Sequence, residues 1–261
     1  MHEMAASTGE RDSGKPRVLI CHSTPLESDP DDPVVFWNDH CVGQVVARLT
    51  GAGIGVIHYK SHGACVADVL GLIGQNEDID VLIVFGHGEG PPEPPRIWNR
   101  KGKKTVLADE RVVEQGAQIG HKGHVLLAAY SCAQFRSAVK TSGLPVLTGF
   151  RWRARVPLVG SRRWQAFGAD DRCRLMECYC RLFIELVVSL AESLVRCSRD
   201  PKALIDTSRR LVEDCRRDLN KAAAWCRERL MASDVWSGHF AGHVCAFACN
   251  AEALCCRPCD E

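Results

Sequence analysis

Two side chains capable of nucleophilic and acid–base chemistry follow two apolar runs of the sequence. The run at 81–85 leads into Gly-His-Gly, which contains His87, and the run at 125–130 leads into Ser-Cys, which contains Cys132. Short apolar runs of this kind are typical of strands buried on both faces of a sheet. Open α/β sheets bind their ligands beyond the carboxyl ends of such strands. The sequence therefore predicts an active pair at one edge of a sheet.

The chemistry expected of His87 and Cys132 is attack by a thiolate, assisted by an imidazole. Such a reaction also needs backbone N–H groups that face the developing oxyanion. Gly88 has no side chain, so its N–H group can approach a substrate carbonyl closely. The N–H group of Cys132, where a strand meets a helix, would point into the same space. His87 and Cys132 are far apart in the sequence, so they meet only if their strands are neighbours.

The elements that must position this pair follow an alternating pattern of apolar runs and helical periodicity. Strands are expected at 17–21, 56–59, 80–85, 125–130 and 144–149. Helices are expected after an N-cap at Asn38, at 66–73, after an N-cap at Asp109, and at 133–140, with a small hairpin at 97–107. Alternation at these short intervals predicts an α/β fold whose strands are parallel and joined by right-handed crossovers.

Two longer helical patterns follow, at 172–194 and from an N-cap at Asp200 to about 230. Arginines gather on the outer face of the second helix: Arg209, Arg210, Arg216, Arg217, Arg227 and Arg229. A solvated face is the favoured interpretation, and a docking surface for an acidic partner is the alternative. We divide the chain into a disordered tail (1–15), a catalytic core (16–198), a helical extension (199–232) and a cysteine-rich tail (233–261).

Composition excludes several classes of function. The chain has 261 residues, enough for one large α/β domain with an extension, and its formal net charge of +1 argues against nucleic-acid or membrane partners. The longest apolar segment, at 182–191, contains Glu185 and is too short to span a bilayer. Fifteen cysteines without a leading apolar segment indicate a reducing cytoplasm, where most thiols act as small hydrophobic groups.

The two motifs, FGHG at 85–88 and AAYSC at 128–132, resemble those of the caspase-like cysteine peptidases. The bacterial CHAT-type branch is the most similar, with an apolar strand ending in His-Gly and a later one ending in a small residue and Cys. The resemblance extends in element order from Arg17 to Leu194. It implies a three-layer α/β sandwich around a mostly parallel sheet, with the long C-terminal helices as an extension.

The resemblance also implies roles for individual residues. Cys132 would be the nucleophile and His87 would protonate the leaving amine. The backbone N–H groups of Gly88 and Cys132 would form the oxyanion hole, and no cofactor is expected. Family members cleave protein substrates in stress or defence pathways and are often activated by a partner protein. The caspase signature Gln-Ala-Cys-x-Gly is replaced here by Ser131-Cys132-Ala133-Gln134, so a preference for Asp substrates is not expected.

Substrate specificity is indicated only by charge. Glu89, Asp170 and Asp171 could line a pocket for a basic side chain of the substrate, by electrostatic complementarity. Acidic residues are common on protein surfaces, so a solvated position is the favoured interpretation for each of them.

Other functions remain open. The chain could be a caspase-like or flavodoxin-like module that binds a partner or a nucleotide without catalysis, although no Gly-rich phosphate loop follows the first strand. A redox role for His87 and Cys132 is a further alternative, but no second cysteine forms a CxxC motif with Cys132.

The C-terminal cysteines suggest a possible metal site. Cys256 and Cys259 form a CxxC motif, and Cys245 with Cys249, or His239 with His243, would complete a tetrahedral zinc set. The spacing matches no standard zinc finger, so we expect a flexible, thiol-rich end without metal.

Overall fold

The computed structural model describes eleven segments of the chain: 17–22, 33–60, 65–76, 79–88, 96–98, 106–116, 124–127, 147–150, 167–197, 200–232 and 237–257. The expected tail at 1–15 and the expected helix at 133–140 lie outside these segments.

A six-stranded sheet forms the centre of the fold, in the order β2-β1-β3-β7-β8-β9. Its strands are β1 (Arg17–His22), β2 (Gly55–Lys60), β3 (Ile79–Phe85), β7 (His124–Leu127), β8 (Leu147–Phe150) and β9 (Leu254–Arg257). The first five strands run parallel to their neighbours, whereas β9 runs antiparallel to β8. The α/β class and the mostly parallel sheet are thereby confirmed.

The apolar runs of the sequence form the middle of this sheet. Val18 to Cys21 of β1 are fully buried, and Val81 to Phe85 of β3 are at most 1% exposed. Strands buried on both faces have no polar alternation, which is why these runs are continuous. The half-exposed β2 lies at the edge of the sheet.

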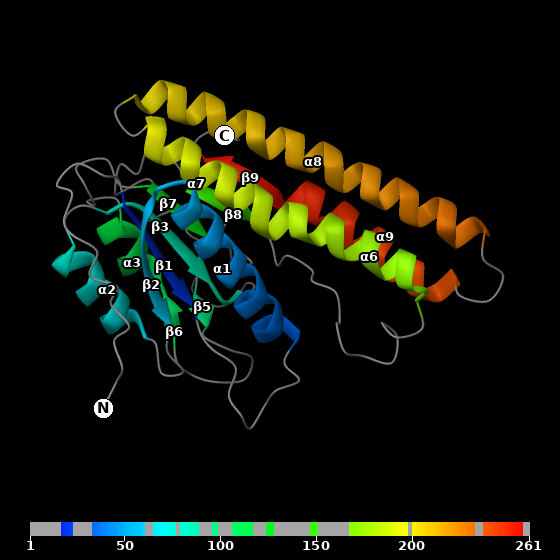
Figure 1. The fold of residues 1–261 in the computed structure, drawn as a ribbon, viewed down its shortest axis with the longest axis horizontal. Helices are drawn as coiled ribbons and strands as arrows, with labels where there is room; N and C mark the ends of the chain where they lie inside the picture. Colours follow the sequence, from blue (N-terminus) through cyan, green and yellow to red (C-terminus); the bar gives the residue numbers. More distant parts are fainter. Residues whose placement is uncertain are drawn as a thin grey trace.

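Helix α1 (Pro33–Gly51) follows β1 and contacts both β1 and β2 (Figure 1). Its buried residues Val42, Val45 and Leu49 recur at helical spacing, as expected. The helix begins at Pro33 instead of after Asn38, so the predicted N-cap was wrong. Proline suits the first helical turn because its missing N–H group would have no partner there. Two residues after the end of α1, Gly53 has a positive φ of 77°, which residues with L side chains rarely adopt, and the helix cannot continue through it.

Two further helices flank the strands, α2 (Val66–Gln75) and α3 (Glu110–Gly116), and they contact each other. The predicted cap of α3 is confirmed, because Asp109 Oδ1 accepts a hydrogen bond of 3.1 Å from the backbone N–H of Arg111. A small antiparallel sheet contains β4 (His87–Gly88), β5 (Ile97–Trp98) and β6 (Val106–Ala108). The pairing of β5 with β6 confirms the expected hairpin.

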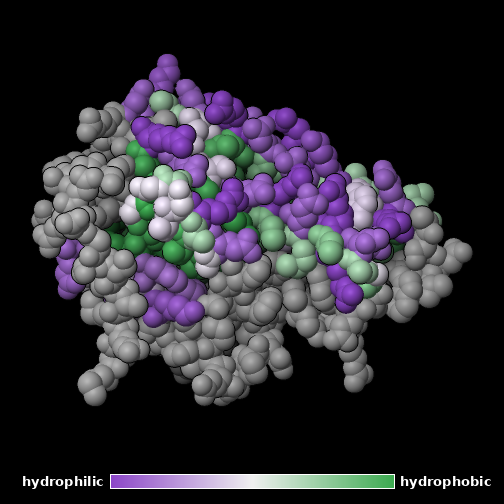
Figure 2. All heavy atoms as spheres, in the orientation of Figure 1, coloured by the Kyte–Doolittle hydropathy of each residue, from purple (hydrophilic) through white to green (hydrophobic). Residues whose placement is uncertain are grey.

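The C-terminal half of the chain forms a bundle of long helices (Figure 1). Helix α6 (Ala169–Cys180), the π-helical turn η3 (Arg181–Glu185) and α7 (Leu186–Cys197) follow one another directly and pack beside α8 (Pro201–Ala232). The predicted N-cap of α8 is confirmed by two hydrogen bonds, because Asp200 Oδ1 accepts from the N–H groups of Lys202 and Ala203. The outer surface of these helices is mainly hydrophilic (Figure 2).

The end of the chain forms regular structure, in contrast to the flexible tail expected from the sequence. Helix α9 (Ser237–Ala253) packs along α8, and β9 follows it directly to become the last strand of the central sheet. Phe240, Phe247 and Leu254 are at most 4% exposed. These apolar groups explain the order, because their burial stabilises the segment. The cysteine-rich end is therefore an integral part of the core over residues 237–257.

Candidate functional site

The candidate catalytic residues follow two neighbouring strands. Strands β3 and β7 are parallel, and Val84 lies opposite Leu127 in the register. Their carboxyl ends therefore meet at the same edge of the sheet. His87 comes two residues after the end of β3 and belongs to β4, where its backbone pairs with Trp98 of β5, while Gly88 pairs with Ile97. Cys132 and the side chain of His87 lie outside the described residues, so their separation stays a prediction.

A second histidine, which was not among the predicted site residues, lies at this edge. His22 is the last residue of β1 and lies opposite Phe85 of β3. Its side chain is 1% exposed, and its Nδ1 lies 3.1 Å from Nε2 of His58 on β2. The two rings are nearly parallel, with centroids 4.9 Å apart. The signal was in the sequence, because His22 follows an apolar run just as His87 does.

Two of the three proposed pocket residues lie on the helical bundle. Asp170 and Asp171 are in the first turn of α6, which Figure 1 shows at the end of the bundle farthest from the sheet. Asp171 Oδ1 accepts hydrogen bonds of 2.8 and 3.0 Å from the guanidinium of Arg229 on α8. Asp171 is thus engaged in an ion pair between α6 and α8, and the pocket role of these residues stays a prediction. Glu89 lies outside the described residues.

The arginines of α8 are largely engaged within the chain. Arg209, Arg217 and Arg229 each form an ion pair with an aspartate. Arg216 donates hydrogen bonds to the backbone carbonyl of Leu254, at 2.9 Å from Nε, and so ties α8 to β9. These contacts favour the interpretation of a solvated face over that of a docking surface.

Only three of the metal candidates have described side chains: Cys245, Cys249 and His243. Cys245 Sγ and Cys249 Sγ lie 3.6 Å apart on α9, whereas the ring of His243 bonds Tyr179 of α6 through Nδ1, at 3.1 Å. Cys259 and the side chains of His239 and Cys256 lie outside the described residues. Among the residues that are described, no group of three or more His, Cys, Asp or Glu side chains could hold a metal ion.

Several thiols act as small hydrophobic groups, as the composition suggested. Cys21 of β1 and Cys41 of α1 are at most 2% exposed, and burial raises the pKa of both thiols well above the ordinary range. Burial, followed by the charges of Asp218 and Glu185, raises the pKa of Cys215 to about 12. A thiol with a raised pKa forms little thiolate, so none of these three is a candidate nucleophile.

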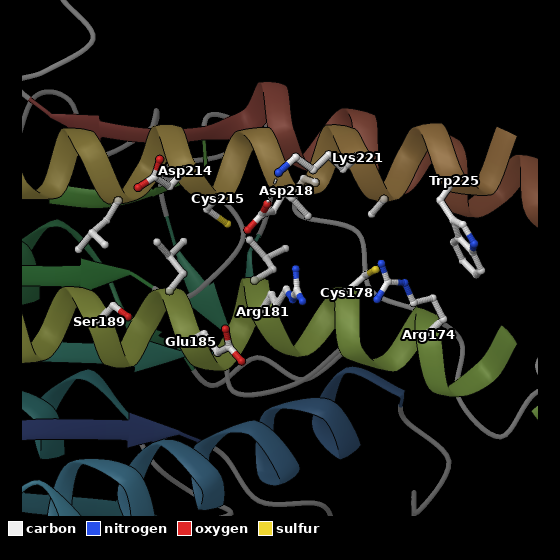
Figure 3. A pocket seen from close by; sticks show the side chains of 15 residues that line it. Arg174, Cys178, Arg181, Glu185, Ser189, Asp214, Cys215, Asp218, Lys221 and Trp225 are labelled. Carbon is white, nitrogen blue, oxygen red and sulfur yellow. Dashed lines mark hydrogen bonds and ion pairs between the residues drawn. The ribbon is translucent and has the colours of Figure 1, made fainter. Parts of the chain in front are cut away.

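A cavity of about 220 Å³ lies between α8 and the continuous helical stretch formed by α6, η3 and α7 (Figure 3). One wall comes from α6, η3 and α7, with Cys178, Arg181 and Glu185, and the other comes from α8, with Asp218 and Trp225. Carboxylates and guanidinium groups line it together with apolar side chains. The described residues that line this cavity all belong to the helices of the bundle.

Comparison with known proteins assigns neither a family nor a function to this chain. The sequence matches no protein-family model, and no curated protein is significantly similar to it. In the described part of the chain, none of the helices is both long and apolar enough to cross a membrane. Evidence for a function therefore comes from the residues at the edge of the sheet and from the strands that carry them.

Proposed function

We propose that this protein is a cysteine endopeptidase of caspase-like fold, with Cys132 as nucleophile and His87 as acid–base catalyst. The observation that carries the proposal is the parallel pairing of β3 with β7. The chain leaves both strands at the same edge, so the segments that lead to His87 and Cys132 start from adjacent positions. This is the position at which open α/β sheets bind their substrates.

The order of the elements supports the same proposal. The small antiparallel sheet β4–β6 follows the His-Gly pair, β7 leads toward the Ser-Cys pair, and β8 and a long helix come next. This order is similar to that of the caspase-like peptidases, including the hairpin that follows the His loop. Helices α1 and α7 contact each other and also the sheet, at β1 and β3 respectively. Such packing favours one helical layer of the three-layer sandwich that we propose.

The proposed reaction has two stages. The Cys132 thiolate attacks the carbonyl carbon of a peptide bond, and a C–S bond forms as the oxyanion binds the N–H groups of Gly88 and Cys132. The C–N bond then breaks, and His87 donates a proton to the leaving amine. In the second stage, water hydrolyses the acyl-enzyme and restores the thiol. The substrate would be a protein or peptide in the cytoplasm, and a partner protein would switch the enzyme on.

A peptide-library cleavage assay tests this assignment with the wild type, Cys132→Ala and His87→Ala. We expect both variants to lose at least 100-fold in rate, because general acid–base and nucleophilic groups contribute about that much or more. Cys173→Ala is the matched control, since Cys173 is an exposed thiol on α6. Circular dichroism shows whether each variant is folded.

Two results would count against the peptidase. If a folded Cys132→Ala or His87→Ala protein cleaves as fast as the wild type, the assigned residue does not catalyse. If the wild type cleaves no library member but Cys132→Ala retains full biological activity, the inactive interaction module is the better interpretation.

A further inference from the structure

The cavity between α8 and the stretch formed by α6, η3 and α7 is long and small. The residues that α8 contributes run from Leu211 to Trp225, a distance of about 21 Å along the helix axis. The cavity volume of about 220 Å³ is below the roughly 300–1,000 Å³ of pockets that hold drug-sized molecules. The cavity therefore suits a small, extended ligand. The proposed peptidase reaction makes no use of it.

Apolar side chains line the cavity from both walls. Leu182 of η3 and Leu219 of α8 are almost fully buried, and Trp225 of α8 contributes a half-buried indole ring. Ligand pockets generally combine apolar surface of this kind with a few polar groups that fix the orientation of the ligand. The apolar part of a ligand is removed from water here, which favours binding.

Positive charge gathers around Cys178. Arg174 and Arg181 lie one helical turn before and one turn after this thiol, and both line the cavity (Figure 3). The two guanidinium groups share one carboxylate, because Arg174 Nη1 and Arg181 Nη2 lie 2.8 and 2.9 Å from the two oxygens of Glu177. Burial raises the pKa of Cys178; both guanidinium groups lower it, and the carboxylates of Glu177 and Asp218 raise it. Each guanidinium has five N–H donors, so the pair can donate further hydrogen bonds to an anionic group.

Negative charge gathers around Cys215 on the other wall. Asp218 of α8 and Glu185 of η3 line the cavity, and Figure 3 shows both beside this thiol. Burial, followed by these two carboxylates, raises the pKa of Cys215 to about 12, so both charges act on one thiol. Lys221 Nζ lies 3.3 Å from Asp218 and balances its charge, whereas Glu185 adds a further negative charge. A cationic group of a ligand is therefore favoured at this end.

One π-helical turn carries a charged group toward each end of the cavity. Arg181 is the first residue of η3 and Glu185 is the last, and both line the cavity. Single π-helical turns inside α-helices occur frequently at functional sites. The cavity thus combines an apolar lining, two ends of opposite charge and a local helix geometry that is common where proteins bind ligands.

We propose that this cavity binds a small linear zwitterion, in which an apolar chain joins an ammonium group to a carboxylate. The ammonium group binds the carboxylates of Glu185 and Asp218. The ligand carboxylate accepts hydrogen bonds from Arg174 and Arg181. A free α-amino acid is a poor match, because its two charged groups share one carbon atom. Short peptides with free ends and ω-amino acids both have the required chemistry, and the site is independent of the proposed catalytic pair.

Isothermal titration calorimetry of the full chain tests the site with two zwitterionic probes, 6-aminohexanoate and the dipeptide leucylleucine. Hexylamine and hexanoate are the controls, because each retains an apolar chain and only one of the two charges. We expect at least one zwitterion to bind in one equivalent, at least tenfold more tightly than either control. Binding of the dipeptide alone would identify short peptides as the ligand class, and binding of 6-aminohexanoate alone would identify ω-amino acids.

Charge-neutral variants separate this cavity from the edge of the sheet. Glu185→Gln and Arg181→Gln should each weaken binding of the zwitterion at least fivefold. Glu192→Gln and Arg209→Gln are the matched controls, since each removes the same charge from α7 or α8 at a residue outside the described lining of the cavity. Both controls should bind as the wild type does. Circular dichroism and the melting temperature confirm that each variant is folded.

Three outcomes would overturn the proposal. The first is that neither zwitterion binds to the wild type. The second is that hexylamine or hexanoate binds as tightly as the zwitterions, which would show that separated charges are not recognised. The third is full affinity in a folded Glu185→Gln or Arg181→Gln variant, or an equal loss in the matched controls, because the binding site would then lie elsewhere.

Discussion

The two ends of the central sheet are built in different ways. Strands β1, β2 and β3 come from the first third of the chain and are joined by helices at short intervals, so all three are parallel. At the other end, β8 and β9 are separated by the entire helical bundle, and β9 runs antiparallel. The first end results from local sequence alternation, whereas the second depends on a contact between distant parts of the chain.

This difference means that the bundle is not an appendage of the sheet. Leu254 of β9 is 1% exposed, and its carbonyl accepts hydrogen bonds from Arg216 of α8. Phe247 of α9 is as fully buried as Leu82 of β3. Sheet and bundle therefore share one core, and changes at the C-terminal end should destabilise the whole protein.

The largest effect is expected from removing the C-terminal end. A variant that ends at Ser233 loses the buried side chains of Phe240, Phe247 and Leu254. Each large apolar side chain contributes about 1.5–3 kcal/mol when buried, so the loss of about 5 kcal/mol or more approaches the whole stability of a typical domain. We expect an unfolded or aggregated product by circular dichroism and size-exclusion chromatography. A control variant that ends at Arg257 retains α9 and β9, and it should fold.

Single substitutions of buried residues compare the contributions of the bundle and the sheet to stability without truncating the chain. Phe247→Ala in α9 should cost about 3–5 kcal/mol, and Leu82→Ala in β3 about 2–5 kcal/mol, because each leaves a cavity in a packed interior. Urea unfolding measures both values. Met231→Ala, at a side chain that is 87% exposed, should change stability by less than about 0.5 kcal/mol. A cost below about 1 kcal/mol for Phe247→Ala would show that α9 is peripheral.

The sequence predicted the parallel half of the fold better than the antiparallel half. Apolar runs identified β1, β2 and β3, and caps at Asp109 and Asp200 located two helix starts. For α9, we treated the cysteines as candidate ligands and overlooked the apolar spacing of Phe240, Phe247 and Ala251. Strand β9 has only four residues, and its partner lies about a hundred positions away in the sequence. No local pattern predicts a pairing of that kind.

The candidate site was predictable only in its outline. The adjacency of β3 and β7 followed from the order of the elements, because consecutive parallel strands tend to be neighbours. The contact of His22 with His58 was missed, since it depends on the register between β1 and β2. The ion pair of Asp171 with Arg229 was missed for a similar reason. It joins two helices whose relative placement the sequence does not specify.

The next largest loss of stability is expected from breaking the contact between Arg216 of α8 and Leu254 of β9. Arg216→Met removes the half-buried hydrogen bonds to the Leu254 carbonyl, and a hydrogen bond from a charged donor contributes about 1.5–3 kcal/mol. The adjacent Arg217→Met removes an exposed ion pair with Asp214, so about 0–0.5 kcal/mol is expected. Urea unfolding of the two variants provides the comparison. Equal costs would show that the Arg216 contact does not hold β9 to the bundle.

The smallest expected effect is on the pH dependence of stability, and it comes from buried thiols of the sheet and of the helical bundle. Cys21 in the sheet has a pKa raised by burial alone, while that of Cys215 in the bundle is raised to about 12 by burial and also by Asp218 and Glu185, which line the same cavity (Figure 3). The folded state keeps the proton that the unfolded thiol loses near pH 9. The free energy of unfolding is therefore unaffected by this thiol well below pH 9, and it decreases as the pH rises from 9 toward 12.

At pH 10 the expected loss from Cys215 is about 1.4 kcal/mol. The unfolding free energy of the wild type should therefore fall between pH 8 and pH 10. In Cys215→Ala the corresponding fall should be smaller by this amount. Asp218→Asn should lower the pKa of Cys215 and leave that of Cys21 unchanged, because the carboxylate contributes only to the bundle thiol. Urea unfolding at several pH values measures these differences. Identical pH dependence in the wild type and Cys215→Ala would mean that water or a local opening solvates this thiol in the folded bundle.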